Sequence, residues 1–285
     1  MPRNWIDAHH HLWRYKREDY PWMSDSLGAL RRDYLLPDLE AVTTSRGVTG
    51  TIAVQARQSM EETEWLSEIA SGTDLIRGVV GWAPLIDPDA ASHLERFACL
   101  PKVKGMRHVL HDEADPNYML RDDFNRGVSL LKDYNLRYDI LIFEQHLPQT
   151  IEFVDRHPNQ VFILDHIAKP KIRERLLTPW RENMKELSRR SNVYCKLSGM
   201  VTEADWTSWQ DEDLAPYIEV VLEAFGPRRI MFGSDWPVCT LAATYQRWAD
   251  AVTKAIERFS ADEQASILAG SAIEAYALDR NRESS

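Results

Sequence analysis

The sequence has few cysteines, no excess of positive charge and no long apolar run. Cys99, Cys195 and Cys239 are odd in number and far apart, which argues against a disulfide framework or a zinc knuckle and predicts free thiols in a reducing compartment. The net charge of −10 argues against a nucleic-acid partner, because proteins that bind phosphate backbones usually present a basic surface. No apolar stretch reaches membrane-spanning length, and the N-terminus lacks a basic segment followed by an apolar one. These absences predict a cytoplasmic protein that acts on a small molecule and has no membrane partner.

Two motifs of other enzyme classes are also missing. No glycine-rich phosphate loop follows the first predicted strand, which argues against a doubly wound nucleotide-binding sheet. No Gly-x-Ser-x-Gly sequence occurs, so nothing predicts a serine nucleophile on a strand-to-helix turn.

What the chain does contain is a regular alternation of short apolar runs with segments of helical period. The runs are apolar throughout, which is typical of parallel strands buried on both faces. The predicted strands span residues 5–9, 49–56, 76–85, 103–110, 137–143, 161–167, 193–199 and 229–237, and most are followed by a segment of helical period, at 61–70, 89–98, 120–134, 147–157, 178–191 and 214–226. Eight such units predict a (β/α)₈ barrel, an α/β fold of the TIM type, as one domain over residues 1–285. An open, doubly wound sheet is the alternative.

Two longer segments complete the predicted domain. Residues 12–39 are too long and too aromatic for an ordinary loop, and we expect them to form a lid over the barrel mouth after the first strand. Residues from about 244 to 278 are expected to form the closing helices.

The stretch WIDAHHHLW at residues 5–13 ends the first predicted strand. In this fold the active site lies where strands end at their carboxyl side, so residues there are candidates for chemistry. Strict alternation places Asp7, His9 and His11 on one side of the strand and His10 on the other. A lone pair of histidines is more often part of the packing than a ligand set.

Strands six and eight end in comparable residues. His166 lies at the end of the sixth predicted strand and Asp235 at the end of the eighth, so both should reach the same mouth as His9 and His11. Three imidazoles and one carboxylate suit either a zinc-like divalent ion or a general base surrounded by proton carriers.

Together, DAHHHLW, the segment containing YPWM, KGMRH, DHIAKP and FGSDWP resemble the amidohydrolase superfamily, in its branch of sugar-acid lactonases and 2-pyrone-4,6-dicarboxylate lactonase. The resemblance runs from residue 5 to about 278. It implies that His9, His11 and His166 are the metal-binding histidines and that Asp235 is both ligand and general base. Binuclear members carry a bridging carboxylated lysine, or a glutamate, where strand four here ends in Arg107-His108, so a second ion is not expected. The resemblance leaves open whether even one ion is required.

Other residues near the strand ends are candidates for substrate contacts. Arg107 and His108 suit a carboxylate or ring carbonyl, Gln55 suits a hydroxyl, and Lys169 suits an anion. The alternatives are an ion pair for Arg107 and a surface role for Lys169. Flat faces for a sugar ring are offered by Trp13, Trp22 and Trp236, although any one of them could belong to the core, as is expected of Trp82 and Cys195; Glu144 and His146 are left open.

The favoured function is hydrolysis of an aldonic acid lactone, such as that of L-fuconic, L-rhamnonic or galactonic acid, by water that Asp235 activates. A bound ion, or Arg107 with His108, would stabilise the oxyanion. The alternatives are a 2-pyrone-4,6-dicarboxylate-type lactonase, a metal-dependent decarboxylase of aromatic acids and a non-catalytic barrel that binds sugar acids. The abundance of tryptophan and the scarcity of cations favour a neutral, polyhydroxylated ring. The sequence is compatible with a homo-oligomer.

Overall fold

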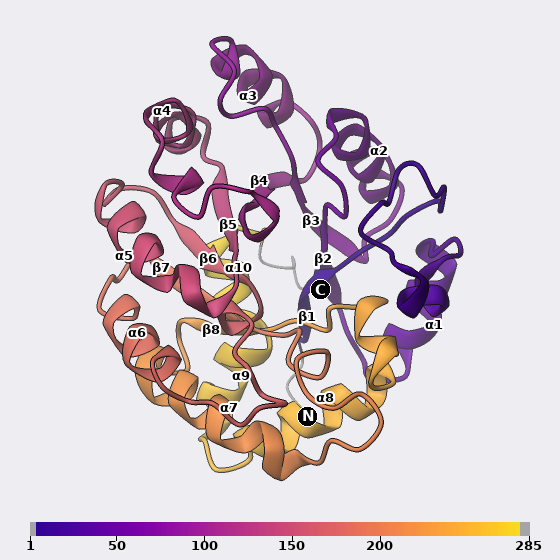
Figure 1. Cartoon of the computed structure of the whole chain (residues 1–285). Coiled ribbons are helices and arrows are strands. Elements are labelled where there is room, and N and C mark those ends of the chain that lie inside the picture. The colour runs from indigo at the N-terminus through magenta and orange to yellow at the C-terminus, as the bar shows by residue number, and fades with distance from the viewer. Residues whose placement is uncertain (1–3, 280–285) are drawn as a thin grey trace.

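The computed structural model describes residues 4–279, so the ends of the predicted domain, residues 1–3 and 280–285, lie outside the described part. Eight strands form one sheet in the order of the chain, and every neighbouring pair is parallel. The strands are β1 (Ile6–His10), β2 (Gly50–Val54), β3 (Ile76–Gly81), β4 (Val103–Val109), β5 (Arg137–Leu141), β6 (Phe162–Leu164), β7 (Val193–Leu197) and β8 (Ile230–Phe232). The predicted (β/α)₈ barrel is therefore confirmed, and the open-sheet alternative is wrong (Figure 1).

Helices surround the strands on the outside of the barrel (Figure 1). They are α1 (Leu36–Thr44), α2 (Met60–Ser71), α3 (Ala90–Ala98), α4 (Asp122–Leu130), α5 (Leu147–Asp155), α6 (Trp180–Leu187), α7 (Asp211–Phe225), α8 (Tyr245–Ile256), α9 (Ala261–Ala265) and α10 (Ser271–Ala275). No helix among residues 4–279 is long and apolar enough to cross a membrane.

The last strand meets the first at the carboxyl end of the barrel. The backbone N–H of Asp235 donates to the carbonyl of His9 at 2.8 Å, and the N–H of His11 donates to the carbonyl of Trp236 at 2.7 Å. These two hydrogen bonds bring the end of β1 against the segment that follows β8.

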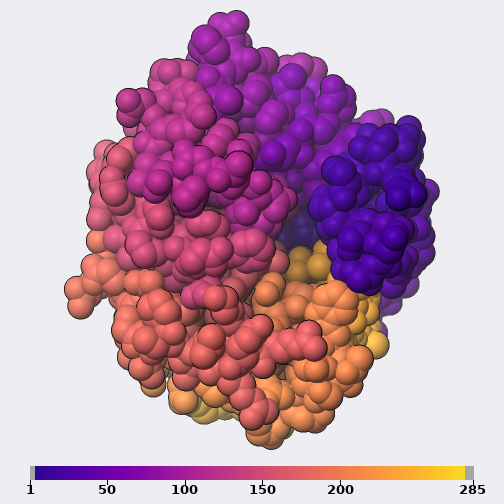
Figure 2. All heavy atoms as spheres, viewed as in Figure 1, coloured from indigo at the N-terminus to yellow at the C-terminus, as the bar shows by residue number. Residues whose placement is uncertain are grey.

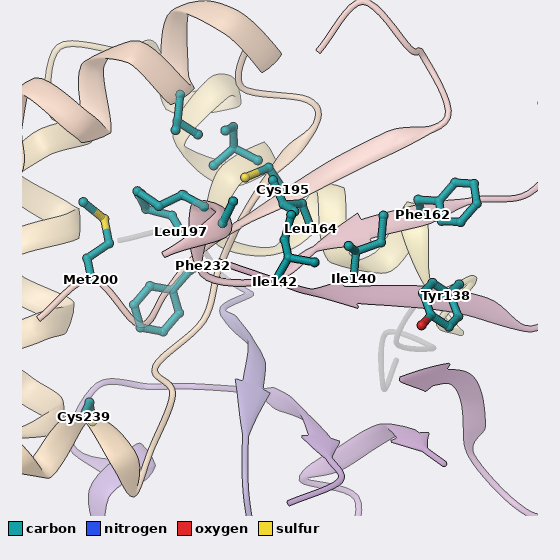
Figure 3. Packing of buried hydrophobic residues seen from close by; sticks show 14 of the residues in the cluster. Tyr138, Ile140, Ile142, Phe162, Leu164, Cys195, Leu197, Met200, Phe232 and Cys239 are labelled. Atoms are coloured by element: carbon teal, nitrogen blue, oxygen red, sulfur yellow. The ribbon is translucent and has the colours of Figure 1, made fainter. Parts of the chain in front are cut away.

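The outward side of the strands packs against the helices. On β5 and just after it, Tyr138, Ile140 and Ile142 alternate along the chain and lie in a row beside Phe162 and Leu164 of β6 (Figure 3). All five are fully buried, which satisfies the period-two pattern expected of a strand with one face on a helical layer. We call the apolar side chains between barrel and helices the outer layer.

The amino end of the barrel is plugged by the chain's final helical segment. A π-helical turn at Ser266–Gly270 leads into α10, and Ala269, Ala272 and Tyr276 from this region pack against Ile6 and Ile52 inside the barrel. The small alanine side chains permit this close approach. The segment expected to form closing helices, 244–278, thus contains α8, α9 and α10.

The predicted lid segment, residues 12–39, contains a 3₁₀ helix at Asp25–Leu30, and its last residues form the first turn of α1, a helix that the sequence pattern did not predict. Tyr20 and Tyr34 are buried within the segment. In the space-filling view it forms the indigo mass beside a hollow at the centre of the face (Figure 2).

Candidate active site

His9 and His11 lie at the carboxyl end of β1, as the sequence predicted. Their Nε2 atoms are 3.2 Å apart, and both side chains are buried. His10 turns away, with its Nε2 3.0 Å from the Thr51 hydroxyl. The predicted position of Asp7 is wrong, because its carboxylate faces away from the pair and accepts a hydrogen bond from Tyr245 of α8. The pairing of β1 with β2 shifts register between Asp7 and His10, and this irregularity breaks the strict alternation.

His166 follows β6 in an unusual turn. Four consecutive residues, 166–169, have positive φ, between 46° and 61°. Left-handed backbone costs roughly 1–2 kcal/mol per residue, so the surrounding packing must hold this turn in place. The turn aims the His166 ring at the site, where its Nδ1 lies 2.9 Å from the Ser198 hydroxyl.

Gly199 makes room for that ring. Its φ is +62°, and a Cβ atom added there would lie 2.5 Å from His166 Nδ1. Any side chain at position 199 would therefore push His166 out of place.

Asp235 lies at the centre of the cluster. Its Oδ1 is 3.4 Å from His11 Nε2 and 3.8 Å from the Nε2 atoms of both His9 and His166. The residue has a φ of 56° and is almost completely buried. The structure thus brings together all four residues that the sequence singled out for chemistry.

The electrostatics of the cluster favour an ionised Asp235 carboxylate beside neutral His9 and His166. Burial alone would raise the pKa of Asp235, but His166 and His11 outweigh burial and keep this pKa below its ordinary value of 3.8. Burial lowers the pKa of His166 to about 4 and that of His9 well below its ordinary value. A carboxylate that stays charged at neutral pH can accept a proton from water.

The same donors fit a divalent ion. The ligand atoms of His9, His11 and Asp235 all lie within 4.8 Å of one another, and those of His9, Asp165 and His166 form a second such group. A tetrahedral zinc ion with bonds of about 2.0–2.2 Å keeps its ligand atoms roughly 3.3–3.6 Å apart, close to the spacing of the first group. These residues can therefore hold one divalent ion. No described acidic or lysine side chain projects from β4 in the place of a bridging ligand, since this position is Arg107.

Arg107 and Gln55 are both buried beside the histidines. Arg107 donates from Nη1 to Asp165 Oδ2 at 2.9 Å and from Nη2 to the backbone carbonyl of Gln55. Its Nε has no partner among the described residues. The side-chain amide of Gln55 donates from Nε2 to the backbone carbonyl of Arg107 at 3.3 Å, and its Oε1 has no partner in the described part of the chain either. Each therefore keeps one buried polar atom that a ligand can satisfy.

His108 is close to Arg107 in sequence but not available in the same way. Its Nδ1 accepts from Trp82 Nε1 at 3.2 Å, and its Nε2 lies 2.6 Å from Glu113. Both ring nitrogens are therefore committed to the protein. Trp82 is only half-buried, so the expectation that it is a core residue is not met.

Lys169 ends the left-handed turn and forms an ion pair with Glu203 at 3.2 Å. It lines a pocket of about 440 Å³ together with Glu144, which itself pairs with Lys171 at 3.1 Å. His146 is buried nearby, with its ring beside Phe143.

The predicted aromatic contacts differ in exposure. Trp13 is fully buried and donates to the Arg32 carbonyl at 2.8 Å, so its ring packs inside the lid segment, with its centre 6.3 Å from that of the His11 ring. Trp236 is 3% exposed and packs edge-on against Tyr34. Trp22 is 36% exposed, and its indole donates to the Ala56 carbonyl at 3.0 Å.

Several polar residues close to the site were not predicted from the sequence. Lys196 of β7 and Asp139 of β5 form an ion pair at 2.6 Å with no exposed surface, and Asp165 lies 2.9 Å from the same ammonium. His111, which stacks on Phe143 with ring centres 4.4 Å apart, was also missed. A charged residue inside an otherwise apolar predicted strand was the available signal for Lys196 and Asp139. Cys195, by contrast, is buried as expected, and burial raises the pKa of its thiol.

Comparison with known proteins gives a consistent result. The sequence matches the amidohydrolase family over residues 6–278. It is 42% identical to an L-fucono-1,5-lactonase from Burkholderia multivorans, over 96% of both chains, and 35% identical to an L-fucono-1,5-lactonase from Burkholderia ambifaria, again over 96% of both. A crystal structure of an amidohydrolase from Burkholderia multivorans with bound zinc has a TM-score of 0.93 and 42% identity, covering 96% of this chain and 99% of that one.

Proposed function

The chain belongs to the amidohydrolase family, and we propose that it opens the ring of a sugar-acid lactone by hydrolysis, with L-fucono-1,5-lactone as the first substrate to test. The observation that carries this proposal is the convergence of an ionised Asp235 with His9, His11 and His166 at the barrel mouth. Two relatives of more than a third identity bear the name of that lactonase.

Asp235 acts as general base in this proposal. Its carboxylate takes a proton from a water molecule as the water oxygen attacks the lactone carbonyl carbon. The proton then passes to the ring oxygen as the acyl carbon–oxygen bond breaks, which yields the open hydroxy acid. A divalent ion held by the histidines and Asp235 would, when bound, polarise the carbonyl as a Lewis acid.

Buried donors stabilise the negative charge that develops on the carbonyl oxygen. Among residues 4–279, Arg107 Nε has no partner, so its N–H can donate to this oxygen. Gln55 Oε1 has no partner there either, and it can accept from a substrate hydroxyl. His108 is better assigned to holding β4 in place than to substrate, because both of its ring nitrogens already have partners.

The charge balance near the mouth supports a neutral ring over a dicarboxylate. Arg107 is paired with Asp165, and Lys169 is paired with Glu203. A substrate with two carboxylates would find neither cation free, whereas a polyhydroxylated ring needs only hydrogen bonds.

We further propose that residues 12–39 act as a lid that limits the access of water during turnover, with Trp22 as its exposed aromatic contact. Trp13 then has a structural place inside the lid. A cytoplasmic location and self-association into a homo-oligomer remain predictions from the sequence.

The decisive experiment measures acid release from freshly prepared L-fucono-, L-rhamnono- and galactonolactones with a pH indicator, corrected for spontaneous hydrolysis. The same enzyme is tested for carbon dioxide release from hydroxybenzoates, and for hydrolysis of 2-pyrone-4,6-dicarboxylate. We expect turnover of at least one sugar lactone and none of the other substrates. Carbon dioxide release without lactone hydrolysis would replace the proposal with the decarboxylase alternative, and no turnover of any substrate would favour a binding protein.

A further inference from the structure

Glu62 is a buried carboxylate outside the histidine cluster, in the first turn of α2. The sequence Ser59-Met60-Glu61-Glu62 has the pattern of a capping box, in which the glutamate side chain bonds back to the backbone N–H of the serine. Only half of this box is formed. The Ser59 hydroxyl accepts from the backbone N–H of Glu62 at 3.2 Å, whereas the Glu62 carboxylate bonds to other parts of the chain.

The Glu62 carboxylate joins the lid segment to the loop that follows β2. Its Oε2 accepts from the backbone N–H groups of Ala56 and Arg57, both at 2.9 Å. Its Oε1 accepts from the hydroxyl of Tyr20, a buried residue of the lid segment, at 3.1 Å. One side chain thus ties residues 12–39 to residues 55–59, which we call the β2 loop.

The contact between Tyr20 and Glu62 does not depend on one protonation state. Burial raises the pKa of Glu62 to about 7, so both forms are present near neutral pH. Backbone N–H groups can only donate, so Oε2 is an acceptor in both forms. A proton on Glu62 therefore lies on Oε1 and is donated to the Tyr20 oxygen, which keeps the hydrogen bond with its direction reversed.

Two further contacts join neighbouring lid residues to the β2 loop. Asp19 forms an ion pair with Arg57 at 2.8 Å, and the Trp22 indole donates to the Ala56 carbonyl at 3.0 Å. The side chains in these two contacts are partly exposed, and solvent weakens such contacts. The hydrogen bond to Glu62 is the buried one of the three, and a buried polar group is costly to leave without its partner.

The other side of the β2 loop is held at the active site. The backbone carbonyl of Gln55 accepts from Arg107 Nη2. Gln58 Oε1 accepts from the backbone N–H of Val109, the last residue of β4, at 3.0 Å. The β2 loop therefore connects the lid segment with two residues that are proposed to contact substrate.

We propose that Glu62 is a positioning residue that fixes the lid segment relative to the substrate-binding residues. Through Tyr20 it holds Trp22 in a constant place relative to Gln55, so that an aromatic face and a hydroxyl acceptor fit the same substrate. Glu62 acts through these residues and takes no part in making or breaking bonds. The kinetic part of this inference rests on the proposed function, whereas the attachment of the lid to the β2 loop does not.

The first test measures the attachment of the lid in the absence of substrate. Tyr20→Phe keeps the ring and removes only the hydroxyl that bonds to Glu62. Tyr34→Phe is the matched control, because Tyr34 is also a buried lid tyrosine but donates to the Ala29 carbonyl within the lid segment, at 3.0 Å. Loss of one hydrogen bond should speed the hydrogen–deuterium exchange of residues 19–24 about 2–10-fold in Tyr20→Phe and leave it unchanged in Tyr34→Phe. Exchange that is unchanged in Tyr20→Phe, or that rises equally in both variants, would overturn the proposal.

The second test measures whether the attachment positions substrate contacts. Glu62→Ala removes the acceptor of all three hydrogen bonds, whereas Glu62→Gln keeps an oxygen for the two backbone N–H groups and an amide that can donate to Tyr20. With the sugar lactone that the enzyme turns over, we expect KM to rise about 3–10-fold in Glu62→Ala with kcat almost unchanged, and both constants to stay near their original values in Glu62→Gln. A merely structural role would lower the melting temperature of Glu62→Ala without changing KM, and that result would contradict the positioning role.

Thermal unfolding of each variant shows whether it is folded. If Glu62→Ala does not fold, the comparison of KM between Tyr20→Phe and Tyr34→Phe decides the question, since only the first should raise it. The two proposals fail separately. A lactone panel without turnover would overturn the proposed function and leave the exchange of the lid unaffected, whereas unchanged exchange in Tyr20→Phe would overturn this inference alone.

Discussion

Neighbouring residues on the same strands face two different environments. On β5, Tyr138 packs in the outer layer while Asp139 points into the barrel, and on β7 the same holds for Cys195 and Lys196. Packing in the outer layer is non-directional and is shared among many side chains. The charged and imidazole side chains inside the barrel, which we call the polar interior, depend instead on specific atom pairs. They are His9, His11, Arg107, Asp139, Asp165, His166, Lys196 and Asp235. Stability is therefore spread over the outer layer, whereas function depends on single contacts in the interior.

The strongest test of this contrast is Asp235→Asn. The change keeps the shape of the side chain but removes the proton acceptor, so kcat should fall by about 10²–10⁴. Melting temperature should change little, because no outer-layer contact is lost. Steady-state kinetics and thermal unfolding on the same samples check both expectations; a variant that keeps more than about a tenth of the original kcat would exclude Asp235 as the base.

A smaller loss is expected from Gly199→Ala. The new methyl group would lie 2.5 Å from His166 Nδ1, and displacement of a positioned group by about 1 Å can cost roughly 10²-fold in rate. Gly47→Ala is the matched control, because Gly47 has a similar φ of +66° but nothing within 4 Å of an added Cβ. Both variants should lose some stability from backbone strain, and only Gly199→Ala should lose kcat/KM. Equal kinetics in the two variants would show that His166 does not need its present position.

Substitutions of Trp22 test whether the lid segment contributes to substrate binding, like the polar interior, or only to stability, like the outer layer. Trp22→Ala should raise KM by about 2–10-fold if the exposed ring stacks on substrate, the range expected for one aromatic contact. Trp22→Phe should retain most of the affinity because it keeps an aromatic ring, although it loses the hydrogen bond to the Ala56 carbonyl. Unchanged KM in both variants would remove Trp22 from substrate binding.

The outer layer should show the reverse behaviour. Ile140→Val removes one buried methylene from a side chain of β5, which typically costs about 0.5–1.5 kcal/mol of unfolding free energy. Denaturant unfolding should show this loss while kcat and KM stay the same. A kinetic defect in this variant would mean that the two sides of β5 are coupled more closely than their contacts indicate.

The smallest expected effect is that of mild acid on the unmodified enzyme. The base works only without its proton, and the pKa of Asp235 lies below 3.8 while that of His166 is about 4. The active forms are therefore fully present above pH 5, and kcat/KM should be flat from there to neutral pH and fall only at lower pH. A pH profile with an acid limb centred above pH 6 would point to another group as the base.

The barrel was readable from the sequence because its strands repeat a strong local signal. Apolar runs such as 137–143 and 193–199 alternate with helical periods, and parallel order follows from the connections. The predicted runs often extended past the true strand ends, as at 137–143 against Arg137–Leu141, because residues that follow such a strand, here Ile142 and Phe143, are as apolar as the strand itself. Helix α1 (Leu36–Thr44) was not predicted because its first turn was assigned to the aromatic lid segment, residues 12–39.

The site was readable only in part. His9, His11, His166 and Asp235 could be placed because strand ends in this fold share one mouth. The position of Asp7 depended on a register shift, and the commitment of His108 to Trp82 depended on a tertiary contact, neither of which leaves a trace in the local pattern.

Closure of the barrel has a consequence for how activity is acquired. The hydrogen bond from Asp235 N to the His9 carbonyl joins residues 226 positions apart, and it holds the proposed base against the first histidines. During synthesis on the ribosome, the β1 histidines emerge early and must wait for β8 before their partner arrives. A nascent or proteolysed chain that ends before Asp235 therefore carries no part of the hydrolytic activity, however much of the barrel it has formed.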